Sequence, residues 1–273
     1  MSETKGRPQM DGKSVNYELI DVLRHLLLIF GGTKGGIFKS GTTLSIRDFL
    51  ICLGAIPIVV DTDPNNPDLD DAIKASEGNN LSVPIDLANQ RGIRAFCDVM
   101  TKALQHPILV SRPGGDAPEF VANAPVIEAV AASLGRRPIF VWSIDTGADA
   151  FRHLEDISTA MSGFEFWVSR PEFFGKPDDF EAFNTSVVGR KFIEANRVID
   201  FPRLPDFVYD GFKATKSQVA EGLAKQEQPT KRLTPKALYE NGSVFDRATI
   251  ELWRAKVKRA LQPLNLGGDH EHA

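Results

Sequence analysis

Cysteine is scarce in this sequence of 273 residues, which has only Cys52 and Cys97 and therefore no CxxC pair. A small secreted scaffold held together by disulfides is excluded, and so is a zinc site built from closely spaced thiols. We expect both thiols to be reduced and buried in a cytoplasmic protein.

Long apolar runs and an excess of basic residues are missing as well. No stretch reaches about 18 apolar residues, the length that a membrane-spanning helix requires. Residues 1–16 lack the charged and then apolar plan of a signal peptide. The 32 Lys and Arg residues stand against 36 Asp and Glu, for a net charge of −4. This balance argues against a surface coated with basic residues for nucleic acid, but it permits a local basic patch.

Apolar runs alternate with helical stretches along the chain, which is typical of a parallel sheet flanked by helices. We predict an α/β fold with a doubly wound, mostly parallel sheet in three α/β/α layers. The predicted strands cover residues 25–30, 56–60, 138–144, 164–169 and 197–201, with a further candidate at 107–111. The predicted helices cover residues 40–53, 178–195 and 245–264, and residues 81–135 are expected to be mostly helical.

The length of the chain suits one large α/β domain. We expect this domain to span residues 19–264, between a flexible N-terminal arm at residues 1–18 and a disordered tail at residues 265–273.

The strongest functional signal is the segment GGTKGGIFKS at residues 31–40, between the first predicted strand and the first predicted helix. Glycines let the backbone wrap around a phosphate, and a helix N-terminus presents unpaired N–H groups to an anion. Lys39 would reach the β- and γ-phosphates of a nucleotide, and the Ser40 hydroxyl would ligate Mg²⁺. The alternative is a plain glycine-rich turn. We predict a P-loop that binds phosphates through Thr33, Lys34, Gly35, Gly36, Ile37, Phe38, Lys39, Ser40 and Gly41.

Phe38 departs from the usual loop GxxxxGK[ST], which has glycine directly before the lysine. If the backbone needs a positive φ here, a bulky residue costs on the order of 1–2 kcal/mol. Nucleotide affinity would then be weaker or altered, and hydrolysis would suffer more than binding, because a γ-phosphate has to be positioned closely. Gly41 is a candidate for relaxing the start of the helix.

Residues 34–40 (KGGIFKS) resemble the deviant Walker A motif, KGGxGK[ST], of the ParA/MinD ATPases. Two further segments follow in the order that this family shows. VVDTDP at residues 59–64 is similar to its DxDP segment, and IDTGA at residues 144–148 is similar to its Walker B and switch II segment. The resemblance covers residues 25–205 and is specific at these three points. Within the family, the chain resembles the plasmid mobilisation and conjugation branch of TraL-, MobD- and StbB-like proteins.

The resemblance implies roles for individual residues. Lys34 matches the lysine that reaches across a dimer interface to the partner's nucleotide, and Asp63 matches the carboxylate that positions the attacking water. Asp61 and Asp145 match acids near the Mg²⁺ that Ser40 also ligates. Independently of the family, acids at the carboxyl ends of parallel strands lie on the rim where ligands bind. The alternative for Asp61 and Asp63 is helix capping or turn chemistry.

We therefore expect a Mg²⁺-dependent, ATP-binding ATPase that acts as a dimerisation switch in plasmid partition, mobilisation or conjugative transfer. ATP would favour a homodimer with Lys34 acting in trans, and the partner would be a plasmid transfer or partition protein. The alternative is a catalytically degenerate nucleotide-binding scaffold with little or no hydrolysis, marked by Phe38. An enzyme that phosphorylates a small molecule is a weaker interpretation, because nothing identifies a substrate pocket.

The C-terminal region permits further interpretations. The predicted helix at residues 245–264 has an apolar stripe that suits membrane binding or, preferably, packing on the domain. Lysines and arginines outnumber acids in residues 211–263, which suits either non-specific contact with DNA phosphates or a solvated basic face. The loop RPEFFGK at residues 170–176 lies on the predicted ligand rim, where its phenylalanines would cover a base, contact a partner or belong to the core.

Overall fold

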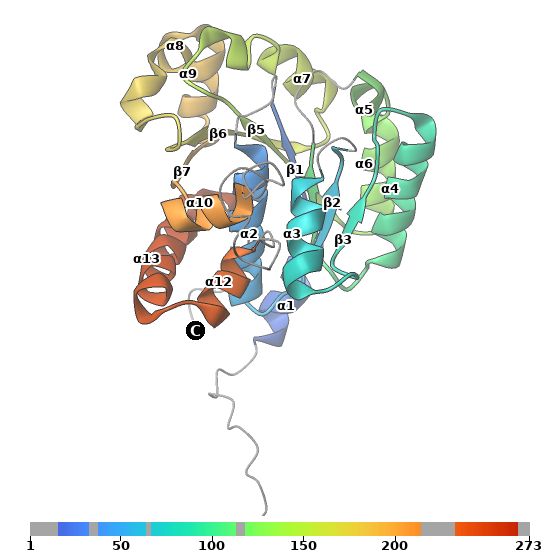
Figure 1. The fold of residues 1–273 in the computed structure, drawn as a ribbon. Helices are drawn as coiled ribbons and strands as arrows, with labels where there is room; N and C mark the ends of the chain where they lie inside the picture. The colour runs from blue at the N-terminus through green and yellow to red at the C-terminus, as the bar shows by residue number, and fades with distance from the viewer. Residues whose placement is uncertain (1–15, 33–37, 64–66, 113–117, 214–232, 267–273) are drawn as a thin grey trace, which may run out of the picture.

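One parallel sheet organises the chain in the computed structural model, which describes residues 16–32, 38–63, 67–112, 118–213 and 233–266. Within these residues, seven strands pair in the order β3-β2-β4-β1-β5-β6-β7, and every pairing is parallel (Figure 1). The predicted fold class is confirmed. The strands are β1 (Leu26–Gly31), β2 (Ile58–Asp61), β3 (Ser82–Pro84), β4 (Ile108–Ser111), β5 (Arg137–Ser143), β6 (Glu165–Pro171) and β7 (Val198–Phe201).

Helices cover both faces of this sheet, which explains why its inner strands are apolar along their whole length. On β1, Leu26, Leu28 and Phe30 belong to one core, whereas Leu27 and Ile29 belong to the other. This alternation is the two-residue repeat of a strand that is buried on both sides. The result is the predicted sandwich of three layers.

The helices divide between the two cores, and Figure 1 shows α2, α10, α12 and α13 gathered on one side and α4, α5 and α6 on the other. The first core is covered by α1 (Tyr17–Leu23), α2 (Lys39–Cys52), α3 (Asp68–Glu77), α10 (Asp206–Lys213), α12 (Pro235–Asn241), α13 (Val244–Leu261) and the 3-10 helix η3 (Gln262–Leu264). The second core is covered by α4 (Gln90–Lys102), α5 (Pro118–Ala122), α6 (Ala124–Ser133), α7 (Leu154–Ala160), α8 (Glu181–Thr185), α9 (Val187–Glu194) and the 3-10 helices η1 (Ala148–Phe151) and η2 (Pro177–Phe180).

Each predicted strand is present, but one predicted helix is wrong. The stretch at residues 178–195 is not continuous, because Ser186 adopts an extended backbone with ψ 157° between α8 and α9. Its side-chain oxygen accepts the N–H of Gly189 at 2.9 Å and so caps the new helix. Strand β3 was not predicted separately, since its three residues are too few to show an alternating pattern.

The C-terminal helix α13 packs on the domain, as the preferred interpretation predicted. Its apolar stripe, Ile250, Trp253, Val257 and Leu261, lies in the first core and is at most 3% exposed. Within the described residues, no helix combines the length and the apolar character that crossing a membrane requires.

The expectation of two buried thiols is wrong. Cys52 is exposed, and Cys97 is partly buried. Cys52 is the last residue of α2, two positions beyond the last buried residue of that helix, Leu50.

Ion pairs hold helix α2 against its neighbours. Arg47 donates to both carboxylate oxygens of Glu77 on α3, at 2.7 and 3.1 Å, and the hydroxyl of Thr234 donates to Glu77 at 2.6 Å. Arg254 on α13 donates to both oxygens of Asp48, at 2.8 and 2.9 Å. Burial opposes the ionisation of Glu77, but the bonds from Arg47 and Thr234 and the charge of Arg47 outweigh it. They lower the pKa of Glu77 below its ordinary value of 4.5.

Replacing Glu77 by glutamine should lower the free energy of unfolding by about 3–5 kcal/mol at pH 7, because Arg47 would keep a buried charge without its carboxylate partner. The pKa of Glu77 is lower in the folded chain than in the unfolded chain. Its stabilising contribution is therefore present above pH 4.5 and is lost as the pH falls through the folded value. Urea unfolding followed by circular dichroism, at pH 7 and then at successively lower pH, measures both effects.

Glu240→Gln is the matched control, because Glu240 pairs with Lys236 at 3.0 Å on the surface of α12. An exposed pair of this kind contributes less than about 1 kcal/mol. Equal losses of stability in the two variants would contradict the role of Glu77 as a buried support of α2.

Candidate functional site

The candidate site lies at the carboxyl edge of the sheet, around the end of β1. Strand β1 ends at Gly31, and its neighbours β4 and β5 end at Ser111 and Ser143. Strands β2, β3 and β4 lie on one side of β1, and β5, β6 and β7 lie on the other. Ligands of open α/β sheets bind at this edge, where the order of the strands changes direction.

Phe38 begins helix α2 with a left-handed backbone, φ 60° and ψ 22°. The condition stated from the sequence is therefore met, since residue 38 adopts the conformation that favours glycine. For phenylalanine this conformation costs on the order of 1–2 kcal/mol. The preceding predicted phosphate ligands, Thr33, Lys34, Gly35, Gly36 and Ile37, lie outside the described residues.

The Phe38 ring packs in an aromatic cluster with Phe173 and Tyr209. Phe38 and Phe173 stack with ring centroids 5.1 Å apart, and Tyr209 lies 6.1 Å from Phe38 and 5.3 Å from Phe173. Phe173 follows β6 and Tyr209 belongs to α10, so three distant segments meet at the start of α2. Each aromatic pair contributes about 0.5–1.5 kcal/mol beyond its burial, which is enough to offset the left-handed backbone.

Gly41 provides the space that the Phe38 ring occupies. A Cβ atom at residue 41 would lie 2.4 Å from Cζ of Phe38, closer than real Cβ contacts. The sequence suggested that Gly41 relaxes the start of the helix, whereas the structure gives it this steric role.

Lys39 is the first residue of α2 and is only 7% exposed. Burial and repulsion from Arg112 lower the pKa of Lys39 to about 8, and the negative charge of Asp63 partly opposes them. A buried cation at the N-terminus of a 14-residue helix is a favourable place for an anion, because the helix dipole adds to the attraction. Ser40 follows it and is half-buried.

Asp61 caps helix α3. Its Oδ2 atom accepts the N–H groups of Leu69 at 3.0 Å and Asp70 at 3.2 Å, and its Oδ1 atom accepts the N–H of Asp63 at 3.3 Å. Burial raises the pKa of Asp61 to about 6, although these hydrogen bonds oppose the rise. These bonds support the capping interpretation that the sequence left open, and the role of Asp61 near Mg²⁺ stays a prediction.

The other predicted acids lie on two sides of β1. Asp63 follows β2, and its charge acts on Lys39. Asp145 follows β5, on the far side of β1 from β2, and its carboxylate accepts the N–H of Gly147 at 2.9 Å. The structure therefore brings Asp63 close to Lys39 and keeps Asp145 apart from the pair of acids after β2.

The described residues contain no group of three or more His, Cys, Asp or Glu side chains arranged to hold a metal ion. Mg²⁺ bound with a nucleotide takes most of its ligands from phosphates and water, with one or two from the protein. Ser40, the second residue of α2, is half-buried and is the hydroxyl that the sequence names as such a ligand. Mg²⁺ binding through Ser40 and Asp145 stays a prediction.

The end of β4 belongs to the same edge, although the sequence did not single it out as functional. Ser111 accepts the N–H and the hydroxyl of Thr62 at 3.1 and 2.9 Å, and the N–H of Arg112 donates to the carbonyl of Phe30 at 3.0 Å. The sequence PGG at residues 113–115, directly after an apolar run, was an available signal. The position of β4 beside β1 could not be read from the sequence.

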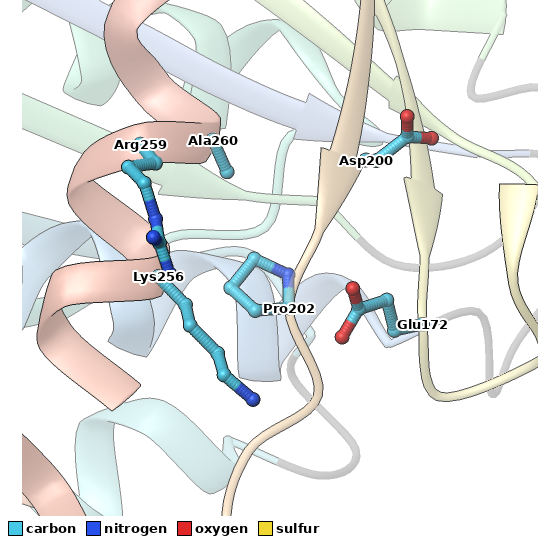
Figure 2. Close-up of a pocket in the computed structure, with 6 residues that line it drawn as sticks. All are labelled: Glu172, Asp200, Pro202, Lys256, Arg259 and Ala260. Atoms are coloured by element: carbon cyan, nitrogen blue, oxygen red, sulfur yellow. The ribbon is translucent and has the colours of Figure 1, made fainter. Parts of the chain in front are cut away.

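A separate recess lies between the ends of β6 and β7 and helix α13 (Figure 2). Its volume is about 380 Å³, and its lining consists of Glu172, Asp200, Pro202, Lys256, Arg259 and Ala260. Glu172, Lys256 and Arg259 are exposed, and Asp200 is engaged by Arg170 at 2.7 Å. The mixed, solvated charges are those of a polar surface groove.

Comparison with known proteins gives one relation for this chain. No family model matches it. It is similar to Protein MobD of Acidithiobacillus ferrooxidans, with 23% identity over 237 residues that cover 86% of this chain and 96% of MobD. The similarity thus extends over nearly the whole of both proteins rather than over the phosphate loop alone.

Gly41→Ala should destabilise the protein by about 1–3 kcal/mol, because the new methyl group overlaps the Phe38 ring. In a Phe38→Gly background the same change should be neutral or stabilising by up to about 1 kcal/mol, since alanine is the better helix former once the ring is gone. Urea unfolding of the wild type, both single variants and the double variant gives the coupling energy. An equal effect of Gly41→Ala in both backgrounds would refute the packing of Phe38 on Gly41.

Proposed function

We propose that this protein is a P-loop protein that binds ATP with Mg²⁺ and acts as a nucleotide-dependent switch in plasmid mobilisation, partition or transfer. The observation that carries the proposal is Lys39, a lysine buried at the first position of a long helix, directly after a left-handed residue at the carboxyl edge of a parallel sheet. The similarity to MobD supports the connection with plasmid mobilisation.

In this proposal the residues around the end of β1 have separate roles in binding the nucleotide and in its hydrolysis. The N–H groups of the loop and Lys39 bind the phosphates, and Ser40 holds Mg²⁺. Lys34 acts across a homodimer, where a second cation offsets charge that develops on the phosphates. Asp63, whose charge already acts on Lys39, orients water.

Three observations favour a second candidate, a nucleotide-binding scaffold with little or no hydrolysis. Phe38 fills a position that favours glycine and is held there by two other rings. Asp61 already accepts three backbone N–H groups. Strand β4 ends at Ser111 and is followed by Arg112, and neither residue supplies a carboxylate beside β1. Each of these limits the positioning of water and metal that turnover needs.

A role in DNA binding would depend on the basic residues of the C-terminal region. The structure shows that these residues differ in their surroundings. Arg254 is engaged by Asp48 inside the protein. Four cations are exposed on α13 and could contact DNA phosphates without sequence specificity, namely Arg247, Lys256, Lys258 and Arg259. Four others lie outside the described residues, namely Lys216, Lys225, Lys231 and Arg232.

The wild type should bind ATP saturably in the presence of Mg²⁺, and Lys39→Ala should weaken this binding more than tenfold, because a buried cation that faces the phosphates is lost. Isothermal titration calorimetry measures both affinities. Lys102→Ala, at the exposed end of α4, is the control and should bind like the wild type.

Absence of binding by the wild type up to millimolar ATP would refute the proposed function. Turnover in the same samples separates the two candidates. A sharp rise of ATP hydrolysis in Phe38→Gly favours the scaffold, because the natural residue then suppresses turnover, whereas unchanged hydrolysis favours the switch.

ATP with Mg²⁺ should convert the wild type from monomer to dimer, and Lys34→Ala should remain monomeric while it still binds ATP. The reason is that the proposed lysine contact is made across the dimer interface and only with nucleotide present. Size-exclusion chromatography with light scattering measures the mass, and calorimetry confirms binding. A variant that dimerises like the wild type would contradict the action of Lys34 in trans.

A further inference from the structure

Helix α13 has a second apolar stripe, on the side opposite the one that packs on the domain. Phe245 is 74% exposed and Leu252 is 70% exposed, and Ala248 and Ala255 are exposed on the same side of the helix. Figure 1 shows α13 at one edge of the molecule. Single exposed apolar residues are ordinary on protein surfaces, whereas a row of them at helical spacing is typical of a face that binds another helix.

The spacing of this outer stripe is that of a coiled-coil seam. Residues 245, 248, 252 and 255 follow one another at steps of three, four and three, and the large residues alternate with alanine. Small residues between large ones leave holes into which the side chains of a second helix fit. The outer stripe is about 15 Å long, which is enough for two turns of a partner helix to lie against it.

Positive charge is concentrated at the carboxyl end of the outer stripe. Lys256 and Lys258 flank this end, Arg259 continues the seam, and all three are exposed. Within the described part of the chain, none of the three forms an ion pair. Glu251, the one exposed acid of α13, is engaged by Arg254 at 3.6 Å. The stripe is therefore apolar at its amino end and cationic at its carboxyl end.

The recess beside the end of β7 adjoins these cations. Figure 2 shows that Lys256 and Arg259 line it from α13. Its acids, Asp200 and Glu172, are engaged from the other side, Asp200 by Arg170 at 2.7 Å and Glu172 by a backbone N–H at 3.3 Å. A carboxylate side chain that entered the recess along α13 would thus meet two cations.

A second copy of this chain does not supply the complementary charge. In a parallel pair of α13 helices, the cations of one copy would face the cations of the other. In an antiparallel pair centred on Leu252, they would face residues 245–249, whose acid, Asp246, is engaged by Ser243 at 2.8 Å. Like charges opposite one another in a helix pair are unfavourable, so the outer stripe suits a different chain with acidic residues.

We propose that the outer stripe of α13 and the cations at its carboxyl end form a docking surface for an acidic amphipathic helix of a partner protein. The partner helix would pack large apolar side chains over Ala248 and Ala255, between Phe245 and Leu252. Its carboxylates would lie beside Lys256 and Arg259. The inference goes beyond the proposed nucleotide switch and does not depend on it, since this surface belongs to α13 and not to the edge around β1.

The probe is a fluorescent helical peptide of about three heptads, with leucine at the seam positions and glutamate at the flanking positions. The wild type should bind it, and Leu252→Gln should weaken the binding at least tenfold, because Leu252 is central to the outer stripe. Fluorescence anisotropy measures the affinity. Glutamine is as good a helix former as leucine, so the melting temperature should not change. Val126→Gln, at a 52% exposed position of α6, is the control and should bind like the wild type.

Charge reversal tests the cationic end. The double variant Lys256→Glu/Arg259→Glu should bind the peptide at least tenfold more weakly than the wild type. A second peptide, with lysine in place of every glutamate, should bind the wild type at least tenfold more weakly than the acidic peptide and should bind the double variant better than it binds the wild type. Arg91→Glu, at an exposed position of α4, should leave the affinities unchanged.

A wild type that does not bind the acidic peptide overturns the proposal, and so does equal binding of the two peptides or an unchanged affinity in Leu252→Gln. Two other partners would use the same cations. Vesicles of phosphatidylcholine and phosphatidylserine that bind the wild type but not Leu252→Gln, without binding of the peptide, would identify a membrane surface instead. Duplex DNA bound equally by the wild type and Leu252→Gln, again without the peptide, would assign the cations to DNA. Either result overturns the proposal. None of these samples contains nucleotide, so their outcome is separate from the test of ATP binding.

Discussion

Burial of helix α2 is the constraint on which the rest of this structure depends. The helix has polar and charged residues on most of its surface, yet nearly all of them are buried. Thr42, Thr43 and Ser45 donate their hydroxyls to carbonyl groups one turn earlier, which satisfies them without outside partners. Arg47 and Asp48 bind carboxylate and guanidinium groups of α3 and α13 instead. Since these bonds fix the helix along its length, its N-terminus has one position at the edge of the sheet.

That position concentrates both strain and charge where the candidate ligand would bind. Phe38 has an unfavourable backbone that its stacking partners offset, and Lys39 is charged in a region that excludes water. Sparsely populated backbone conformations of this kind persist only where the surrounding structure determines them, and they are common at functional sites. Here the surrounding structure is the aromatic cluster, because it joins the first turn of α2 to the segment after β6 and to α10.

The charged groups at this edge of the sheet suit the binding of an anion better than they suit efficient hydrolysis. The groups nearest the end of β1 are cationic, and the acids that the family resemblance suggested lie after β2 and after β5, with β1 and β4 between them. On the proposed function, a site of this composition suits the binding of a polyphosphate better than the positioning of water and metal for attack. The similarity to MobD extends over almost the whole chain, which fits a protein whose complete domain, and not only its loop, matters for its role.

The sequence by itself determined the class of fold, and it named the place of the candidate site. Apolar runs and helical periodicity are local patterns, so the strands were predictable, and the departure from glycine marked Phe38 as the residue whose backbone conformation mattered. Only the tertiary structure decided which residues surround that place. Strand β4 lies between β1 and β2, Phe173 and Tyr209 meet Phe38, and Arg112 lies beside Gly31. Each of these contacts joins segments far apart in the chain. Their proximity follows from strand order and from the packing of side chains, which local patterns do not encode. The break at Ser186 and the exposure of Cys52 were missed for a similar reason, because capping and burial depend on neighbours that the helical pattern does not show.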